Sequence, residues 1–225
     1  MIAVLALAII GIVMLQDGDK TPARDAQVDA WLREIRSART PEQRLQAIGR
    51  LAERGPHAVA DVLDRTISLG DDTAGFSEHI IDGLSMLPES RILPILDAAI
   101  TSSRPNVRVG AAMIARIMGP RAKSLSARLA QAGKDKNQWV RWYSLDAISA
   151  MGPEASSVVG QLIQLFRHRD NHTQRRAIEA VGKIGPLARV TRPDLSRILR
   201  DIASDSRNST ELRGYASAAL RQVGE

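Results

Sequence analysis

The chain contains no cysteine and very few aromatic residues. The lack of cysteine excludes disulfides, thiolate nucleophiles and cysteine-based zinc sites. Aromatic residues make up 3% of the 225 residues, whereas apolar residues as a whole make up 44%. A core of Ala, Leu, Ile and Val suits closely packed helices better than a β-sandwich, whose strands favour aromatic and β-branched side chains. The composition therefore favours an all-α protein with a sizeable core.

Acidic residues are in the minority overall, and the charge is unevenly distributed. Residues 1–100 hold 10 Lys/Arg and 15 Asp/Glu, a net charge of −5, whereas residues 101–225 hold 21 and 10, a net charge of +11. A basic half of this kind attracts acidic proteins, nucleic acid or anionic lipid headgroups. A solvated basic surface without a dedicated partner is the alternative.

The sequence has one long uncharged apolar run, residues 1–15. A fully apolar helix has no face for water, so it lies in lipid or deep in a core. Fifteen residues span about 22 Å, compared with about 30 Å of bilayer hydrocarbon. We expect a membrane anchor or an uncleaved signal segment. A cleaved signal peptide and a buried core helix are the alternatives, but no basic residue precedes the run and no small-x-small cleavage site follows it.

The expected domain boundaries follow from this run. Residues 1–16 form the anchor or signal segment, residues 17–25 a polar linker, and residues 26–225 the folded body. Lys20 and Arg24 follow the apolar run, and the positive-inside rule would then leave the body in the cytoplasm. Because this argument rests on two residues, the sequence leaves the side of the membrane open.

A triplet of a small apolar residue, Gly and Pro recurs along the body. Complete triplets end at Pro120, Pro153 and Pro186, and looser copies end at Pro56 and Pro88, so that these prolines are spaced 32 or 33 residues apart. Glycine accepts the left-handed conformation that ends a helix, and proline suits the first turn of the next one. Each triplet therefore predicts a tight corner between two helices. The interval after Pro186 is longer, which predicts a few inserted residues around Leu187 to Arg192.

Apolar residues recur at helical spacing on both sides of each corner. One such helix pair cannot bury its apolar face alone, so stacked copies are needed to form a continuous core. The pattern predicts an all-α fold, an α-solenoid of about six helix pairs. The predicted pairs cover residues 26–54, 56–86, 88–118, 120–151, 153–184 and 191–223.

Two Val-Arg pairs and the Gly-Pro corners carry a family resemblance. Val107-Arg108 followed by Ala111-Ala112, and Val140-Arg141, resemble HEAT repeats, particularly the short HEAT-like type also found in phycobilisome lyases. The resemblance covers residues 26–225, with the copy at 75–86 departing most, since Phe76 replaces the arginine and the corner lacks glycine. It implies that the helix with the Val-Arg pair lines the concave face and the Pro-started helix the convex face.

The resemblance also implies a ladder of Asp and Arg side chains between repeats. Asp135 lies six residues before Arg141, and Asp170 lies six before Arg176. An internal ladder and ligand binding by the arginines are both compatible with this spacing. The predicted partner-binding residues of the basic stretch from about 104 to 213 are Arg108, Arg141, Trp142, Arg175, Arg176 and Arg213.

Trp139, Trp142 and Tyr143 form an aromatic cluster beside basic residues. Such a cluster can anchor a partner or stack on bases. Alternatively, one tryptophan fills the core between repeats and the other shields it.

Catalytic signals are absent from the sequence. We find no phosphate-binding loop, nucleophile triad or paired-carboxylate site, and His168 and His172 lack a third metal ligand. We therefore expect no catalytic residue, metal or cofactor, and no small-molecule substrate is evident. Some HEAT-like proteins are DNA glycosylases that use Trp, Asp and Arg, and Trp142 and Asp146 lie four residues apart. A glycosylase-type enzyme that binds nucleic acid is the alternative, and a bilin lyase is a weaker one.

The sequence thus predicts a membrane-tethered HEAT-repeat scaffold, not an enzyme. A basic concave groove would bind an acidic protein or peptide, and residues 1–15 would hold the scaffold at a membrane.

Overall fold

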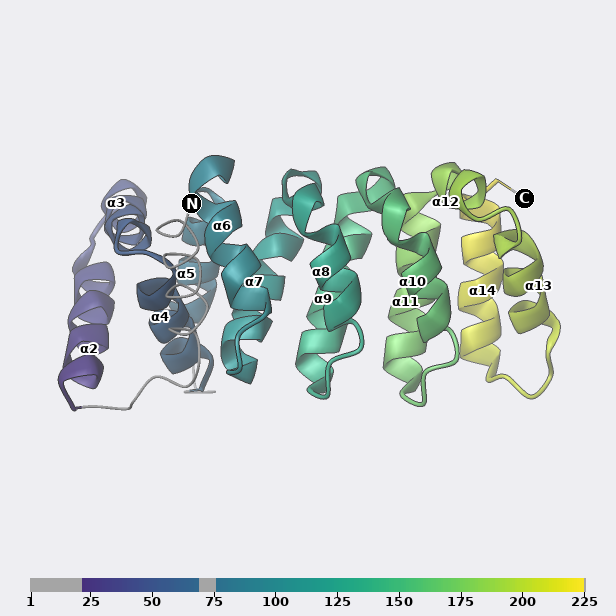
Figure 1. The fold of residues 1–225 in the computed structure, drawn as a ribbon, viewed down its shortest axis with the longest axis horizontal. Coiled ribbons are helices and arrows are strands. Elements are labelled where there is room, and N and C mark those ends of the chain that lie inside the picture. Colours follow the sequence, from purple (N-terminus) through teal and green to yellow (C-terminus); the bar gives the residue numbers. More distant parts are fainter. Residues whose placement is uncertain (1–21, 69–75, 225) are drawn as a thin grey trace, which may run out of the picture. The chain divides into compact units, whose positions relative to one another are not determined.

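The computed structural model describes residues 22–68 and 76–224 (Figure 1). Within these ranges the chain is helical and has no β-strand, which confirms the predicted all-α fold. The chain forms two compact units, one up to Ala111 and one from Ala112 onward. The predicted anchor at residues 1–15 lies outside the described residues. In the part that is described, no helix has both the length and the apolar character to cross a bilayer.

The first unit consists of helices that pack against their neighbours along the chain. They are α2 (Pro22–Ser37), α3 (Pro41–Glu53), α4 (Pro56–Ser68), α5 (Phe76–Ser85), α6 (Glu89–Ile100) and the first half of α7 (Pro105–Met118). Helix α2 begins inside the segment 17–25 that the sequence predicts to be a linker. Pro22 is compatible with this start because the first helical turn does not need its N–H.

Local sequence signals set the start of α3. The Thr40 hydroxyl accepts a hydrogen bond from the Gln43 backbone N–H at 3.2 Å, and the Gln43 side-chain oxygen accepts one from the Arg39 N–H at 2.9 Å. Pro41 occupies the first turn. These contacts satisfy N–H groups that have no partner inside the helix.

Aliphatic side chains form the core of the first unit, and an ion-pair network lies beside it. The fully buried residues include Ile48, Leu63, Ile80, Leu84, Ile92 and Leu96. The Asp61 carboxylate accepts hydrogen bonds from Arg24 Nε at 2.8 Å and from Arg104 Nη1 at 2.9 Å. Burial favours the neutral acid, but these hydrogen bonds hold the pKa of Asp61 below its usual value. The network connects α2, α4 and the turn before α7.

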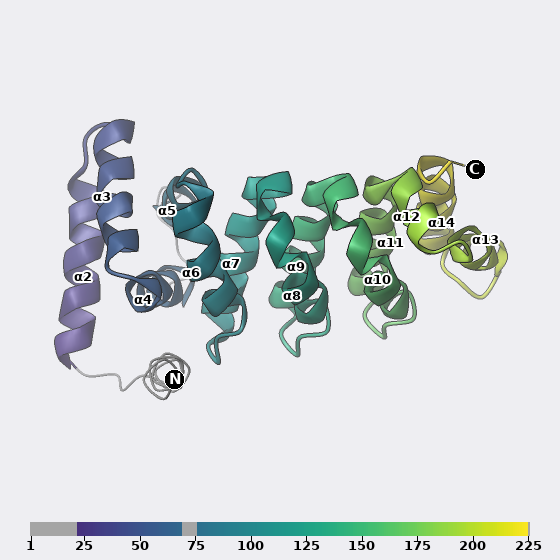
Figure 2. The same ribbon diagram turned by 45° about the horizontal axis from the view of Figure 1, so that its top comes forward.

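The second unit repeats one helix pair. Its elements are η1 (Gly119–Leu125), α8 (Ser126–Ala132), α9 (Gln138–Met151), η2 (Gly152–Val158), α10 (Val159–Leu165), α11 (Asn171–Ile184), α12 (Pro186–Thr191), α13 (Leu195–Ser204) and α14 (Thr210–Gln222). We call α9, α11 and α14 the A helices, and α8, α10 and α13 the B helices. Each A helix packs against the next, and each B helix packs on the A helix that follows it (Figures 1 and 2).

The Gly-Pro triplets form the predicted corners. Gly119, Gly152 and Gly185 have φ angles of +55°, +58° and +73°, where a residue with a side chain is strained. A Cβ at Gly119 would also lie 3.3 Å from the Ala150 carbonyl oxygen in the next A helix, and a Cβ at Gly152 would lie 3.6 Å from that of Lys183. The positive φ angles therefore require glycine at the corners, and at Gly119 the tight contact with the following repeat is a second reason.

Small buried residues separate the A helices. Ser144, Ala177 and Ala216 occupy corresponding positions in α9, α11 and α14, and all three are fully buried. Small side chains at these positions let the helix backbones approach closely. His79 occupies the corresponding position of the repeat in the first unit. It is larger than these residues, and it is exposed.

The inserted residues of the last repeat form a helix of their own. Helix α12 occupies positions 186–191, and α13 starts only at Leu195. In the other repeats of this unit a 3₁₀ turn leads directly into the B helix. The last B helix is thus offset along the chain, and it lines one of the cavities described below.

Candidate protein-binding surface

Two of the predicted partner-binding arginines lie inside the protein. Arg108 and Arg141 are 8% and 9% exposed. Arg108 Nη1 donates to the carbonyl oxygens of Ser102 and Ser103 at 2.8 and 2.9 Å. In the next repeat, Arg141 Nη1 donates to two carbonyl oxygens of its preceding turn at 3.0 and 3.2 Å. Both guanidinium groups tie a turn to the start of the helix that follows it, so they contribute little surface for a partner.

In the next copy, Gln174 donates a hydrogen bond to the preceding turn in the same way. It stands where the sequence repeat has arginine, and its Nε2 donates to the Phe166 carbonyl oxygen at 3.1 Å. In the last copy, Arg213 Nη2 instead contacts the Thr210 hydroxyl at 3.3 Å. The side chain at this position of the repeat therefore mainly donates hydrogen bonds to carbonyl oxygens of the preceding turn.

Asp170 links two successive A helices. Its Oδ2 accepts hydrogen bonds from Arg141 Nη2 at 2.8 Å, Trp142 Nε1 at 2.9 Å and the Thr173 hydroxyl at 2.6 Å. Its Oδ1 caps α11 by accepting from the His172 N–H at 3.1 Å. Burial favours protonation, but the hydrogen bonds from Thr173, Arg141 and Trp142 hold the pKa of Asp170 well below its usual range. One carboxylate thus organises the junction of α9 and α11.

The other members of the predicted ladder occupy different positions. Asp135 contributes its backbone carbonyl to Arg141, and its carboxylate accepts from the Asn137 N–H at 2.8 Å. Arg176 pairs with Asp146 on α9, with 3.0 Å between Nε and Oδ1. The interactions therefore connect neighbouring repeats through Arg141–Asp170 and through Arg176–Asp146.

Two arginines of α11 lie on aromatic rings of the neighbouring A helices. The Arg176 guanidinium carbon is 5.1 Å from the centre of the Trp142 ring, and that of Arg175 is 5.4 Å from the centre of the Tyr215 ring. Arg175 also reaches Glu211 on α14 at 3.4 Å. Both side chains remain partly exposed, at 26% for Arg175 and 20% for Arg176. We call the outward side of α9, α11 and α14 around these residues the A-helix surface.

The aromatic cluster continues this surface along α9. Trp139 and Trp142 meet edge to face with 5.1 Å between ring centres, and Tyr143 stacks against Trp139 at 6.5 Å. The Trp142 ring also contacts His172 at 5.0 Å. Trp142 is thereby enclosed by neighbours, whereas Trp139 is 50% exposed. The two tryptophans thus have different environments, one inside the junction and one at the surface.

Acidic side chains alternate with the arginines on the A-helix surface. Burial raises the pKa of Asp146, although Arg176 and Arg116 act in the opposite direction. Burial likewise raises the pKa of Glu179, against the effect of Arg175 and Arg176. The surface therefore has mixed charge, and its arginines are fixed by partly buried carboxylates.

A cavity of about 500 Å³ opens between the N-terminal ends of α11 and α14. Its charged and aromatic lining comes from His172, Arg175, Arg207, Glu211 and Tyr215. Arg175 thus belongs to both the cation–π contact and the cavity wall. The cavity gives the A-helix surface a concave portion where a side chain of a partner could enter.

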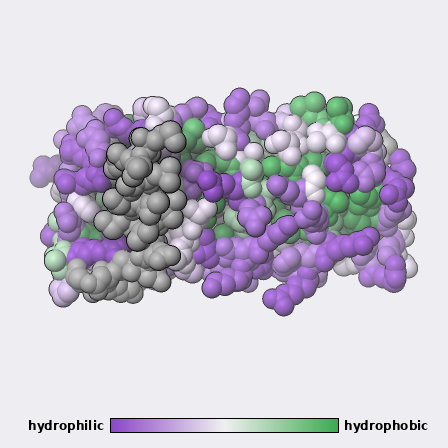
Figure 3. Space-filling model, in the orientation of Figure 1, coloured by the Kyte–Doolittle hydropathy of each residue, from purple (hydrophilic) through white to green (hydrophobic). Residues whose placement is uncertain are grey.

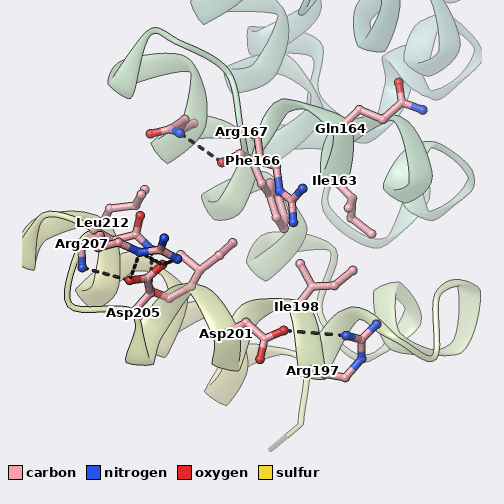
Figure 4. A pocket seen from close by; sticks show the side chains of 13 residues that line it. Ile163, Gln164, Phe166, Arg167, Arg197, Ile198, Asp201, Asp205, Arg207 and Leu212 are labelled. Carbon is pink, nitrogen blue, oxygen red and sulfur yellow. Dashed lines mark hydrogen bonds and ion pairs between the residues drawn. The ribbon is translucent and has the colours of Figure 1, made fainter.

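A second cavity, of about 780 Å³, was not predicted from the sequence. It lies between α10 and α13, and Figure 4 shows Ile163, Phe166 and Ile198 on its walls. Arg167, Arg197, Asp201, Asp205 and Arg207 also line it. In Figure 3 hydrophobic side chains are visible among hydrophilic ones in this region. The only sequence signal related to this cavity was the longer interval after Pro186, and that interval did not reveal where α13 would lie.

The residues that suggested an enzyme are engaged in internal contacts. Trp142 is held by Asp170 and covered by Arg176, and Asp146 pairs with Arg176. His168 Nδ1 accepts a hydrogen bond from the Asp170 N–H at 3.0 Å. Within residues 22–68 and 76–224, His, Asp and Glu side chains do not form a group of three or more that could hold a metal ion.

Comparisons with known proteins agree with this architecture. Residues 125–221 match the family model for HEAT repeats, and no curated protein matches the chain. An engineered protein of known crystal structure is similar with a TM-score of 0.53 and 17% identity, over 88% of this chain and 96% of the other.

Designed armadillo repeat proteins are similar as well. One has a TM-score of 0.50 and 13% identity, over 88% of this chain and 100% of its own. Another, designed for modular peptide recognition, has the same score and identity over 87% and 99% of the two chains. At these identities the likeness concerns the fold alone. Together with the family match over residues 125–221 and the Gly-Pro corners, it supports a HEAT-like repeat protein with an α-solenoid fold.

Proposed function

We propose that this chain is a binding scaffold that holds an acidic, extended segment of a partner protein on its A-helix surface. The observation that carries the proposal is the fixed placement of Arg175 and Arg176 on Tyr215 and Trp142. A repeat solenoid is compatible with a protein-binding role, since stacked helices offer an extended surface.

Stacked guanidinium groups suit the recognition of carboxylates. An arginine that lies on an aromatic face keeps the N–H groups at its edge available for bidentate hydrogen bonds. Arg175 and Arg176 are held by Glu211 and Asp146, so less side-chain entropy is lost when a ligand binds. The exposed Trp139 adds an aromatic group of the kind that often dominates binding energy.

The geometry of the A helices favours an extended ligand. Helices that pack at 8–10 Å place α9 and α14 about 20 Å apart, a distance that about six extended residues cover. Such a segment would cross α9, α11 and α14 in turn. The designed proteins for modular peptide recognition have a similar fold, which supports this mode without identifying a ligand.

The tether is a separate part of the proposal. The apolar run at residues 1–15 would hold the scaffold at a membrane, because it carries no charge or solvated face. Nucleic acid is the second candidate partner, since residues 101–225 have a net charge of +11.

Labelled peptides of about ten residues can test the binding site, since they cover the surface with a margin. The full chain is titrated with a Glu-rich peptide and with a Lys-rich peptide of the same spacing, and binding is followed by fluorescence anisotropy. We expect the Glu-rich peptide to bind and Arg175→Glu/Arg176→Glu to weaken it by at least about tenfold. Arg197→Glu is the control, because Arg197 is an exposed residue of B helix α13.

Thermal melting by circular dichroism shows whether the variants are folded. Unchanged peptide affinity in a folded Arg175→Glu/Arg176→Glu variant would contradict the proposal. Equal binding of the Glu-rich and Lys-rich peptides would contradict it too. Stronger and steeply salt-dependent binding of an oligonucleotide would favour the second candidate.

A further inference from the structure

The turns that join each B helix to the next A helix form one edge of the second unit. They cover residues 133–137, 166–170 and 205–209. In Figure 1 these turns lie along the lower side, and Figure 2 shows them again at the end away from the Gly-Pro corners. We call this row of turns the loop edge.

Cationic side chains project from every turn of the loop edge. The residues are Lys134, Lys136, Arg167, Arg169 and Arg207. Lys134 donates to the neutral Gln164 side chain at 2.7 Å. In the described part of the chain, Lys136, Arg167 and Arg169 make no ion pair with an acidic side chain. Because these charges are not compensated locally, they remain available to an external anion.

The acidic residues of the same turns are engaged within the protein. The Asp170 carboxylate is held by Arg141 and Thr173, and the Asp135 carboxylate accepts from a backbone N–H. Asp205 pairs with Arg207 at 2.9 Å, but Asp205 is 29% exposed whereas Arg207 is 89% exposed. The loop edge thus presents its positive charges outward and its negative charges inward.

An exposed aromatic side chain lies at the same edge. Trp139 stands in the first turn of α9, next to the turn that holds Lys134 and Lys136, and it is 50% exposed. Tryptophan beside lysine and arginine is the side-chain combination enriched where proteins meet the headgroup region of a bilayer.

We propose that the loop edge docks on the surface of an anionic lipid bilayer. A row of cations from successive turns matches a planar array of negative headgroups, and each Lys or Arg near such a surface adds to the attraction. The apolar run at residues 1–15 is the argument for a bilayer over another polyanion, because it predicts that the chain is held at a membrane.

The proposal can be tested with vesicles and the full chain. Co-sedimentation is measured with vesicles of phosphatidylcholine alone and of phosphatidylcholine mixed with phosphatidylserine. Since the apolar run can bind both, the informative quantity is the ratio of the two partition coefficients. We expect the parent chain to prefer the anionic vesicles, and Lys136→Glu/Arg167→Glu/Arg169→Glu to reduce that preference at least about tenfold.

A matched control changes the same amount of charge at the opposite end of the helices. Arg121→Glu/Lys123→Glu/Arg189→Glu alters exposed residues of η1 and α12, beside the Gly-Pro corners. This variant is expected to keep the preference for anionic vesicles within about twofold. Circular dichroism melting of both variants separates a loss of docking from a loss of fold.

Three results would overturn the proposal. The first is equal binding of the parent chain to both kinds of vesicle, and the second is an unchanged preference in the folded loop-edge variant. The third is an oligonucleotide whose binding depends on the loop edge while vesicle binding does not. The peptide assay on Arg175 and Arg176 uses other residues, so failure of one proposal is distinguishable from failure of the other.

Discussion

Asp170 shows how much one residue contributes to the junction of two repeats. Its carboxylate accepts hydrogen bonds from Arg141, Trp142 and Thr173, and its side chain is 20% exposed. Because the pKa of Asp170 is lowered on folding, its stabilisation is fully present above the unfolded pKa of about 3.9 and is lost as the pH falls below it.

Asp170→Asn is therefore expected to lower the free energy of unfolding at pH 7 by about 1–3 kcal/mol. The variant should also lose less stability than the parent between about pH 5 and pH 2, since the titrating group is gone. Urea denaturation at several pH values measures both effects. Parallel pH profiles for parent and variant would show that Asp170 does not carry this dependence.

Ser144 and Thr173 are both fully buried, but only one hydroxyl has a partner. Thr173 Oγ1 donates to Asp170 and accepts from Arg141, whereas Ser144 Oγ has no hydrogen-bond partner in the described structure. Ser144→Ala should raise the free energy of unfolding by about 1 kcal/mol, because it removes an unsatisfied polar group. Thr173→Val should lower it. Urea titration compares the two, and a destabilised Ser144→Ala would contradict this assignment.

At the scale of the element, glycine is expected to favour stability at a corner and to reduce it inside a helix. Gly152 has a φ of +58° at a corner, whereas Gly214 lies inside α14, where a Cβ would have no neighbouring atom within 4 Å. Gly152→Ala should destabilise the protein by about 1–2 kcal/mol through backbone strain. Gly214→Ala should stabilise it by about 0.5–1 kcal/mol through helix propensity. Thermal melting of the two variants checks the signs, and equal shifts would contradict the corner geometry.

The last helix pair shows how an insertion changes an element. Helix α12 takes up the residues after the Gly185-Pro186 corner, and two of its side chains, Leu187 and Val190, are 46% and 75% exposed. The following B helix, α13, then lines a cavity with α10 that no local sequence pattern predicts. The insertion thus adds a helix before the last B helix, while α14 packs against α11 as α11 does against α9.

At the scale of the whole molecule, stability should be distributed by repeat. In a solenoid each helix pair depends mainly on its neighbours. Leu162→Ala, which truncates a fully buried side chain of α10, is expected to cost about 2–4 kcal/mol. Hydrogen exchange should show the loss mainly in residues 112–224 and less in residues 22–68 and 76–111. An equal loss of protection in both units would instead indicate one cooperative structure.

The sequence alone determined the helix pairs and their corners. These features depend on local properties: the φ preference of glycine, the missing N–H of proline and the period of apolar residues. For the same reason the inserted residues after Pro186 were predictable, because a changed spacing is visible without coordinates. The resemblance of Val140-Arg141 to HEAT repeats also predicted the α-solenoid fold, which the structure confirms.

Tertiary structure decided which of the arginines are buried in turns and which reach the surface. Arg141 and Arg175 both lie in A-helix segments, but Arg141 points into a turn and Arg175 lies on a ring of the neighbouring helix. The difference depends on the direction of each side chain and on which residues of the adjacent repeat lie beside it. The sequence pattern of a single repeat contains neither kind of information. The loop edge has the same origin, because its cations come from turns about 35 residues apart in sequence that only stacking of the helices places in one row.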